Sequence, residues 1–303
     1  MDEETIIKNI ENIDWNQLSL EQLKLLRSKI SKTIDIKRQD LYLTKSTGKM
    51  SQTHEYKASL GKVSPSRLRS SLSEYNKCVF GISLGSKNFV DSKRIEACIK
   101  WISENFQSCL VLVADSVYRL TIEVRQGIKG DEAKLLAIRT GEEFVNKNNF
   151  LFDKYCGSCE FEFKMASQIE KESEFEIYYQ ELQCLYQKDQ SFQKIINSFA
   201  EIYLNRGEQV KEENKQIEDS LQKKMYLSTT YILEESALNA CLVKQGWSVF
   251  VYPGSIKTFE EISEGLHPQV PEPLKQMVWV SLRLKQSYKA GHSSVTETKN
   301  NHY

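Results

Sequence analysis

Two short apolar runs flank an amphipathic segment in the middle of the chain. The runs are CVFGIS at residues 78–83 and CLVLVAD at residues 109–115, and between them SKRIEACIKWISENF has apolar residues at helical spacing. Nearly continuous apolar runs of this length are typical of strands buried on both faces of a parallel sheet. The three segments therefore predict one right-handed βαβ unit.

A further helix and strand follow late in the chain. STTYILEESALNACLVKQ, residues 228–245, predicts a helix that Gly246 ends, and WSVFVYP predicts a strand closed by Pro253. Charged helical segments are expected between these parts, at about residues 130–149 and 170–204. From Cys78 onward the pattern is typical of a doubly wound α/β domain with inserted helices.

The first 70 residues have a different pattern. Residues 18–43 begin with Ser19 and Gln22 at capping-box spacing and continue with an apolar stripe, which predicts a helix with a basic, solvated opposite face. Residues 51–71 contain Ser, Gly and Pro and are interpreted as a connector. We therefore predict a helical N-terminal extension over 1–70, a catalytic domain over 71–286 and a polar C-terminal tail over 287–303.

Composition and charge indicate a globular protein. The 303 residues include 41 Lys+Arg and 41 Asp+Glu, so the net charge is zero and any RNA contact needs a local basic patch. The N-terminus has no apolar targeting segment and no apolar run is long enough to span a bilayer, so we expect a cytoplasmic protein without membrane contact. Seven cysteines predict reduced thiols, and Cys156 and Cys159, which form the only CxxC pair, lack the further ligands of a zinc site.

A Gly-x-Ser-x-Gly pattern ends the first predicted strand at residues 81–85. Ligands of open parallel sheets bind at the carboxyl ends of strands, where Gly81 permits close approach to the backbone and Gly85 permits a tight exit. Loop amides before a helix starting near Ser92 could stabilise an oxyanion. Ser83 is therefore a nucleophile, a phosphate-loop donor, or a small residue at a turn; GxxxxGK[ST] and GxGxxG are both missing, which disfavours the second interpretation.

A serine hydrolase needs a histidine after the nucleophile. His54 precedes Ser83, and His292 and His302 lie in the predicted tail, so His267 is the candidate partner. A serine hydrolase with a GxSxG nucleophile remains the alternative function.

An activated ester removes the need for histidine. A positioned serine can be acylated by an aminoacyl ester with modest base assistance. Such an enzyme must also hold an ammonium group, and Tyr231 and Glu235 lie four residues apart on one helical face, where a phenol and a carboxylate could do so. The same spacing also fits an ordinary exposed Tyr–Glu contact.

Three motifs together resemble a known family. GISLGSKNF after the first strand, YILEESAL on the late helix and VFVYPGSI on the following strand are similar to the tRNA-dependent cyclodipeptide synthases, over roughly Lys77 to Ile262. The resemblance implies an α/β, Rossmann-like doubly wound parallel sheet, related to the catalytic domains of class I tyrosyl- and tryptophanyl-tRNA synthetases but without an ATP site or cofactor. It also implies an aminoacyltransferase, expected to be a monomer, that converts two aminoacyl-tRNAs into a 2,5-diketopiperazine by a ping-pong route.

The resemblance also assigns residues. Ser83 matches the nucleophile, Tyr231 and Glu235 the pair that holds the amino group, and Tyr252 a tyrosine that supports the serine and cyclisation. Ser86 and Pro253, at the positions that divide the family, imply the XYP subgroup. The implied substrate-binding residues are Val79, Gly81, Gly85, Ser86, Leu112, Ala114, Asn205, Arg206, Leu238, Phe250 and Pro253, although the apolar members also fit a sheet core.

The tRNA-binding surface is left open by the sequence. The helix after the second strand is strongly basic in some members of the family. Here Lys129, Lys134, Arg139 and Lys147 are interspersed with acidic residues. The basic face of the N-terminal segment is a second candidate for contact with tRNA.

Overall fold

The computed structural model describes residue 19 and residues 54–205 and 215–288. Residues His54–Ser287 form one structural unit. The predicted N-terminal helix apart from Ser19, residues 289–303 of the predicted tail and Arg206 lie outside the described residues, whereas Ser287 and Tyr288, assigned to the tail, end a strand.

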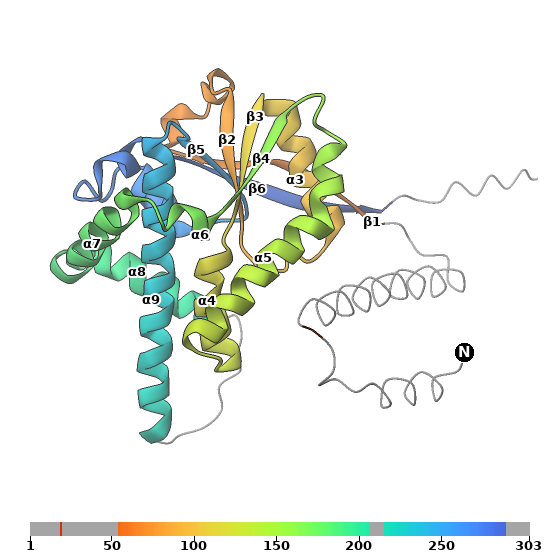
Figure 1. Cartoon of the computed structure of the whole chain (residues 1–303). Helices are drawn as coiled ribbons and strands as arrows, with labels where there is room; N and C mark the ends of the chain where they lie inside the picture. The colour runs from red at the N-terminus through yellow and green to blue at the C-terminus, as the bar shows by residue number, and fades with distance from the viewer. Residues whose placement is uncertain (1–18, 20–53, 206–214, 289–303) are drawn as a thin grey trace, which may run out of the picture. The chain divides into compact units, whose positions relative to one another are not determined.

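A six-stranded sheet with the order β1-β6-β5-β2-β3-β4 forms the centre of this unit (Figure 1). β2 pairs in parallel with both β3 and β5, and the outer pairs β3–β4 and β5–β6 are also parallel. The chain thus builds outward from β2 in both directions, which confirms the predicted doubly wound sheet. The strands are β1 (His54–Ser64), β2 (Lys77–Ile82), β3 (Ser108–Val113), β4 (Glu160–Met165), β5 (Val249–Pro253) and β6 (Val278–Tyr288).

Helices connect the strands and cover the sheet. α3 begins at the predicted position, Ser92, because the Asp91 carboxylate accepts a hydrogen bond from the Lys93 amide at 3.0 Å. No helix in the described ranges is long and apolar enough to cross a membrane. The α-helices are α3 (Ser92–Asn105), α4 (Asp115–Gln126), α5 (Gly130–Asp153), α6 (Ala166–Ile169), α7 (Ser173–Lys188), α8 (Gln190–Asn205), α9 (Lys215–Lys244) and α10 (Lys257–Ser263), and short 3-10 helices span Ser66–Leu68, Leu72–Glu74 and Glu272–Gln276.

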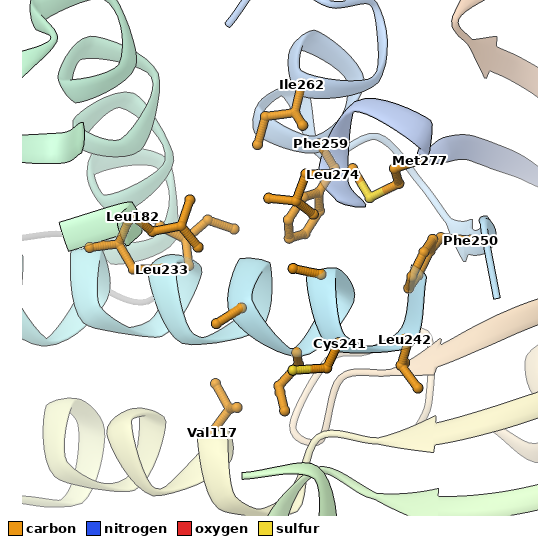
Figure 2. Close-up of a cluster of buried hydrophobic side chains, with 14 of the residues drawn as sticks. Val117, Leu182, Leu233, Cys241, Leu242, Phe250, Phe259, Ile262, Leu274 and Met277 are labelled. Carbon is orange, nitrogen blue, oxygen red and sulfur yellow. The ribbon is translucent and has the colours of Figure 1, made fainter. Parts of the chain in front are cut away.

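Side-chain alternation along the strands divides the core into two layers. Val79 of β2 packs into a cluster formed with α4, α7, α8, α9 and α10, whereas its neighbours Cys78 and Phe80 pack into a second cluster with α3, α5 and β1. Figure 2 shows how Leu233 and Leu242 of α9 belong to the first cluster, with side chains from both sides of this helix. α9 is therefore held from several directions.

Three strands were not predicted. β1 occupies the segment interpreted as a connector, so that interpretation is wrong, and residues 54–64 belong to the sheet. β1 and β4 lie at the two edges of the sheet, where polar side chains alternate with partly buried ones and no continuous apolar run arises. β6 was missed because its second half, LRLKQSY, is polar.

The helical segments also differ in detail. The predicted helix at 170–204 is broken at Asp189, whose carboxylate accepts a hydrogen bond from the Phe192 amide at 2.9 Å and starts α8. The helix that directly follows β3 is α4, so the lysine-containing segment at 130–149 is the next helix, α5. All seven cysteines are free thiols, as predicted.

Candidate active site

A cavity of about 640 Å³ lies at the carboxyl ends of β2 and β5. These strands are neighbours, but the chain leaves them toward opposite halves of the sheet, and a crevice opens where two such connections diverge. The cavity is lined by the loops 83–88 and 252–258, by side chains of α4 and α8, and by Tyr231 and Glu235 of α9.

Ser83 meets Tyr231 in this cavity. The Ser83 Oγ lies 3.4 Å from the Tyr231 hydroxyl oxygen, across 148 positions of sequence. The Tyr231 ring is buried and stacks against Tyr203 and Phe199, with ring centroids 5.4 Å and 6.0 Å away. Burial, with the nearby Glu235 carboxyl, raises the pKa of Tyr231 well above its usual value, so the phenol stays protonated and can donate a hydrogen bond.

Glu235 lies one helical turn beyond Tyr231 and lines the same cavity. Burial raises the pKa of Glu235 from 4.5 to about 8. Within the described part of the chain, no cation is paired with this carboxylate. Because α9 is fixed by the core, Glu235 is poised to accept a cationic group from a ligand.

We expect Glu235 to make stability fall as pH rises. Between pH 4.5 and about 8 the folded protein keeps a proton that the unfolded chain has lost, so ionisation favours unfolding across this window. Glu235→Gln, which cannot ionise, should gain stability relative to wild type by on the order of 2–4 kcal/mol between pH 5 and pH 8.5. Urea unfolding at both pH values measures this difference. An unchanged difference would contradict the raised pKa.

Tyr252 lies at the end of β5, beside the Ser83 strand. Its ring packs between Phe89 and Trp279, with centroids 5.9 Å and 6.0 Å away. A Cβ on Gly81 would lie 3.9 Å from the Tyr252 ring, at ordinary van der Waals distance, so the ring lies beside the end of β2. The two strand-end loops are also joined directly, because Asn88 Nδ2 donates to the Pro253 carbonyl at 2.7 Å.

Gly85 shapes the loop that follows Ser83. Its φ is +80°, and a Cβ there would lie 2.9 Å from the ring of Tyr118. We expect Gly85→Ala to destabilise the protein by about 1–2 kcal/mol from the left-handed backbone alone, with more from the clash. Gly157→Ala is the control, because its Cβ would meet nothing within 4 Å. Equal urea midpoints for the two variants would contradict a constrained Gly85.

The predicted substrate-binding residues separate into groups. Gly85, Ser86 and Pro253 line the cavity together with the four predicted catalytic residues. Asn205 is exposed at the end of α8, and Gly81 lies behind Tyr252 without lining the cavity. Five apolar residues pack in the first core cluster rather than on the cavity surface, and these are Val79, Leu112, Ala114, Leu238 and Phe250.

His267 does not partner Ser83. It is buried, its Nε2 lies 3.3 Å from a Glu261 carboxylate oxygen, and its ring packs edge-on against Phe192. No histidine of the described residues lines the cavity. The Ser83–His267 hydrolase hypothesis is therefore wrong in its geometry, because the turn after α10 directs the histidine toward α8.

Other residues of the cavity were not predicted. Phe199 and Tyr203 of α8 extend the stack on Tyr231, and the Tyr203 hydroxyl donates to Thr121 Oγ1 at 2.5 Å. The Arg125 guanidinium lies 5.7 Å from the Tyr203 ring. The i, i+4 spacing of the two aromatic residues was visible in the sequence, but such a pair is equally typical of a helix core.

Comparisons with known proteins agree with this architecture. A family model described as cyclodipeptide synthase matches residues 65–268, while a search of curated proteins found no match. A cyclodipeptide synthase structure from Fluoribacter dumoffii has a TM-score of 0.62 and 22% identity, covering 78% of this chain and 100% of the other.

Two further structures share the fold. A cyclodipeptide synthase from Candidatus Glomeribacter gigasporarum bound to Phe-tRNAPhe has a TM-score of 0.52 and 17% identity over 78% of this chain and 98% of its own. A Mycobacterium tuberculosis protein, described as showing that cyclodipeptide synthetases are related to type I tRNA synthetases, has a TM-score of 0.52 and 10% identity over 77% and 94%. Since the family model covers most of the chain, this protein belongs to the cyclodipeptide synthase family.

Proposed function

We propose that the protein joins two amino acids from aminoacyl-tRNAs into a 2,5-diketopiperazine through an aminoacyl-enzyme on Ser83. One observation supports this most strongly. A serine hydroxyl, a buried phenol and a carboxyl of raised pKa face the same cavity, and the described residues supply neither a cationic partner for this carboxyl nor a histidine in the cavity. This set suits an ester that is already activated and carries an amino group.

In the first step, Ser83 Oγ attacks the ester carbonyl of an aminoacyl-tRNA. The Oγ–carbonyl bond forms, the bond to the ribose oxygen breaks, and the serine proton passes to that leaving oxygen. The amides of Ser86 and Phe89 donate within the loop, to Ser83 and Ser86 carbonyls. The amides of Gly85 and Lys87 have no such partner among the described residues and are the candidates to stabilise the oxyanion.

Glu235 and Tyr231 hold the amino group of the acyl-enzyme. The pKa of Glu235, about 8, is close to that of an α-amino group, about 7.7–8.0, so a proton can pass between them at little cost. The freed amine attacks the ester of the second aminoacyl-tRNA and forms a dipeptidyl-enzyme. The new terminal amine then attacks the Ser83 ester, which closes the ring and restores the serine hydroxyl; Tyr252 supports this last step from the side of β5.

The cavity also carries cationic side chains. Lys87, Arg125 and Lys257 line it from three different elements, although the net charge of the chain is zero. Such a local concentration of positive charge suits the phosphates at the acceptor end of tRNA. These side chains are therefore a more direct candidate for the tRNA contact than α5, on which lysines alternate with acids.

The experiment is a reconstitution. The purified protein is incubated with a mixture of aminoacyl-tRNAs, and the products are analysed by mass spectrometry. We expect cyclic dipeptides that appear only when the tRNA is charged. Uncharged tRNA with free amino acids and ATP is the control. Absence of every cyclic dipeptide, with charged tRNA intact, would overturn the proposal.

A further inference from the structure

The loop after Tyr252 is held by side chains that the reaction itself does not use. Pro253, Gly254 and Ser255 line the cavity directly after Tyr252. Two separate sets of side-chain contacts connect this loop with β1. One runs from Lys62 to Ser255, and the other runs from Tyr56 to Pro253.

The first set is centred on Glu260. Its side chain is only 9% exposed, and its Oε1 accepts a hydrogen bond from Ser255 Oγ at 2.6 Å. Ser281 Oγ donates to the same oxygen at 3.1 Å, and Lys62 Nζ of β1 donates to Oε2 at 2.7 Å. Glu260 thus ties the loop to β6 and to the edge strand β1. Burial acts to raise the pKa of Glu260, but the hydrogen bonds from Lys62, Ser255 and Ser281 and the charge of Lys62 lower it below its ordinary value, so the carboxylate stays ionised.

The second set ends on Pro253. Asn88 Nδ2 donates to the Pro253 carbonyl, and Arg94 Nη1 donates to Asn88 Oδ1 at 2.9 Å. Both polar atoms of the Asn88 amide are therefore engaged, which fixes its orientation. The Arg94 guanidinium in turn lies over the ring of Tyr56 on β1, 4.7 Å from its centroid.

The strands place these contacts next to the reacting groups. Ser281 is the residue of β6 that pairs with Tyr252. β1 lies beside β6, and Gly61 approaches it so closely that a Cβ there would lie 2.7 Å from the Ser281 carbonyl oxygen. Lys62 directly follows this contact. Three neighbouring strands thus connect Tyr252 with Lys62, although β1 precedes the residues 65–268 that the family model matches.

We propose that β1 positions the loop 253–255 for catalysis. Lys62 and Glu260 position Ser255, and Arg94 and Asn88 position Pro253. The inference rests on the proposed use of Ser83 and Tyr252, because it is their relative placement that the loop sets. Small displacements of a reacting group lower rates by up to about 10²-fold. Lys62, Glu260 and Arg94 are therefore expected to affect turnover although they do not line the cavity, whereas Asn88 both lines the cavity and holds the loop.

Two measurements on full-length variants test the proposal. Hydrogen–deuterium exchange reports the mobility of residues 254–257, and kcat/KM for cyclic dipeptide formation reports turnover. The variants are Lys62→Met, Glu260→Gln, Asn88→Ala and Lys62→Arg. Lys57→Met is the matched control, because Lys57 is an exposed lysine of the same strand.

We expect Lys62→Met, Glu260→Gln and Asn88→Ala each to speed exchange in residues 254–257 and to lower kcat/KM roughly tenfold, mainly through kcat, while exchange in α3 and α9 is unchanged. Lys62→Arg should restore most of the activity because it keeps the donor. Lys62→Met and Glu260→Gln combined should cost less than the sum of both, since they remove one interaction.

Three results would refute the proposal. Unchanged exchange at 254–257 in Lys62→Met and Glu260→Gln, or an equal loss in Lys57→Met, would refute the proposal. A general increase of exchange throughout the domain would also refute it, because the contacts would then be merely structural. If wild type makes no cyclic dipeptide, the proposed function fails, but the exchange data still decide whether β1 holds the loop.

Discussion

Replacement of Ser83 by alanine is expected to abolish both the covalent aminoacyl-enzyme and the cyclic dipeptide. Removing a nucleophile that forms a covalent intermediate costs on the order of 10³-fold or more in rate. Its loss should leave the fold intact, because Ser83 is half-buried and its described side-chain contact is the 3.4 Å approach to Tyr231. Aminoacyl-tRNA labelled in the amino acid should therefore transfer label to wild type and not to Ser83→Ala.

Two controls make this result specific. Ser103→Ala changes a serine of α3 whose described hydrogen bond lies within its own helix, at 2.8 Å to the Lys100 carbonyl, and should be labelled like wild type. Ser83→Cys retains a nucleophile and should keep detectable labelling. Label retained by Ser83→Ala at the wild-type level would remove the nucleophile assignment while leaving the family and fold untouched.

Replacement of Arg119 by methionine is expected to cause a large loss of stability. Arg119 of α4 donates to both carboxylate oxygens of Glu234 on α9, at 2.9 Å and 2.5 Å, and lies 4.0 Å from Glu170. Ser116 also donates to Glu170. Without Arg119 the buried Glu234 loses its partner, and removing one member of a buried ion pair costs about 3–5 kcal/mol. Urea unfolding at pH 7 measures this loss.

A double variant separates the ion pair from simple loss of packing. In Arg119→Met combined with Glu234→Gln no charge remains unpaired between these positions, so much of the stability should return. Burial already raises the pKa of Glu234, and Arg119 acts against that rise. The stability lost in Arg119→Met should therefore be smaller at low pH, where Glu234 is protonated. A loss below about 1 kcal/mol would place the pair with ordinary surface ion pairs.

Glu234 and Glu235 show the limit of reasoning from sequence. They are identical neighbours on one helix, yet Glu234 is bound by Arg119 whereas Glu235 faces the cavity without a described partner. The spacing of Glu235 from Tyr231 made it a candidate but also fitted an ordinary exposed contact, and the resemblance then favoured the catalytic role. Nothing in the chain between residues 115 and 126 indicated that Arg119 would point at α9.

The central strands could be predicted because they are buried on both faces. β2, β3 and β5 appear as continuous apolar runs, and the serine at the end of β2 was identified from its glycines. The edge strand β1 could not be predicted in the same way, since a strand with one neighbour keeps polar residues on its exposed side. The two sets of contacts that connect Lys62 and Tyr56 of β1 with the loop after Tyr252 could therefore not be predicted from the sequence either.

The sequence by itself determined the doubly wound α/β class and the candidate reacting groups, because burial periodicity and short motifs are local properties of the chain. Only the tertiary structure decided which of these groups meet. Ser83 and Tyr231 are 148 positions apart and approach to 3.4 Å because the neighbouring strands β2 and β5 and the buried helix α9 are packed against one another. The same packing moved His267 away from the cavity, buried the apolar candidates in the core, and raised the pKa of Glu235, since desolvation depends on every element that surrounds a group.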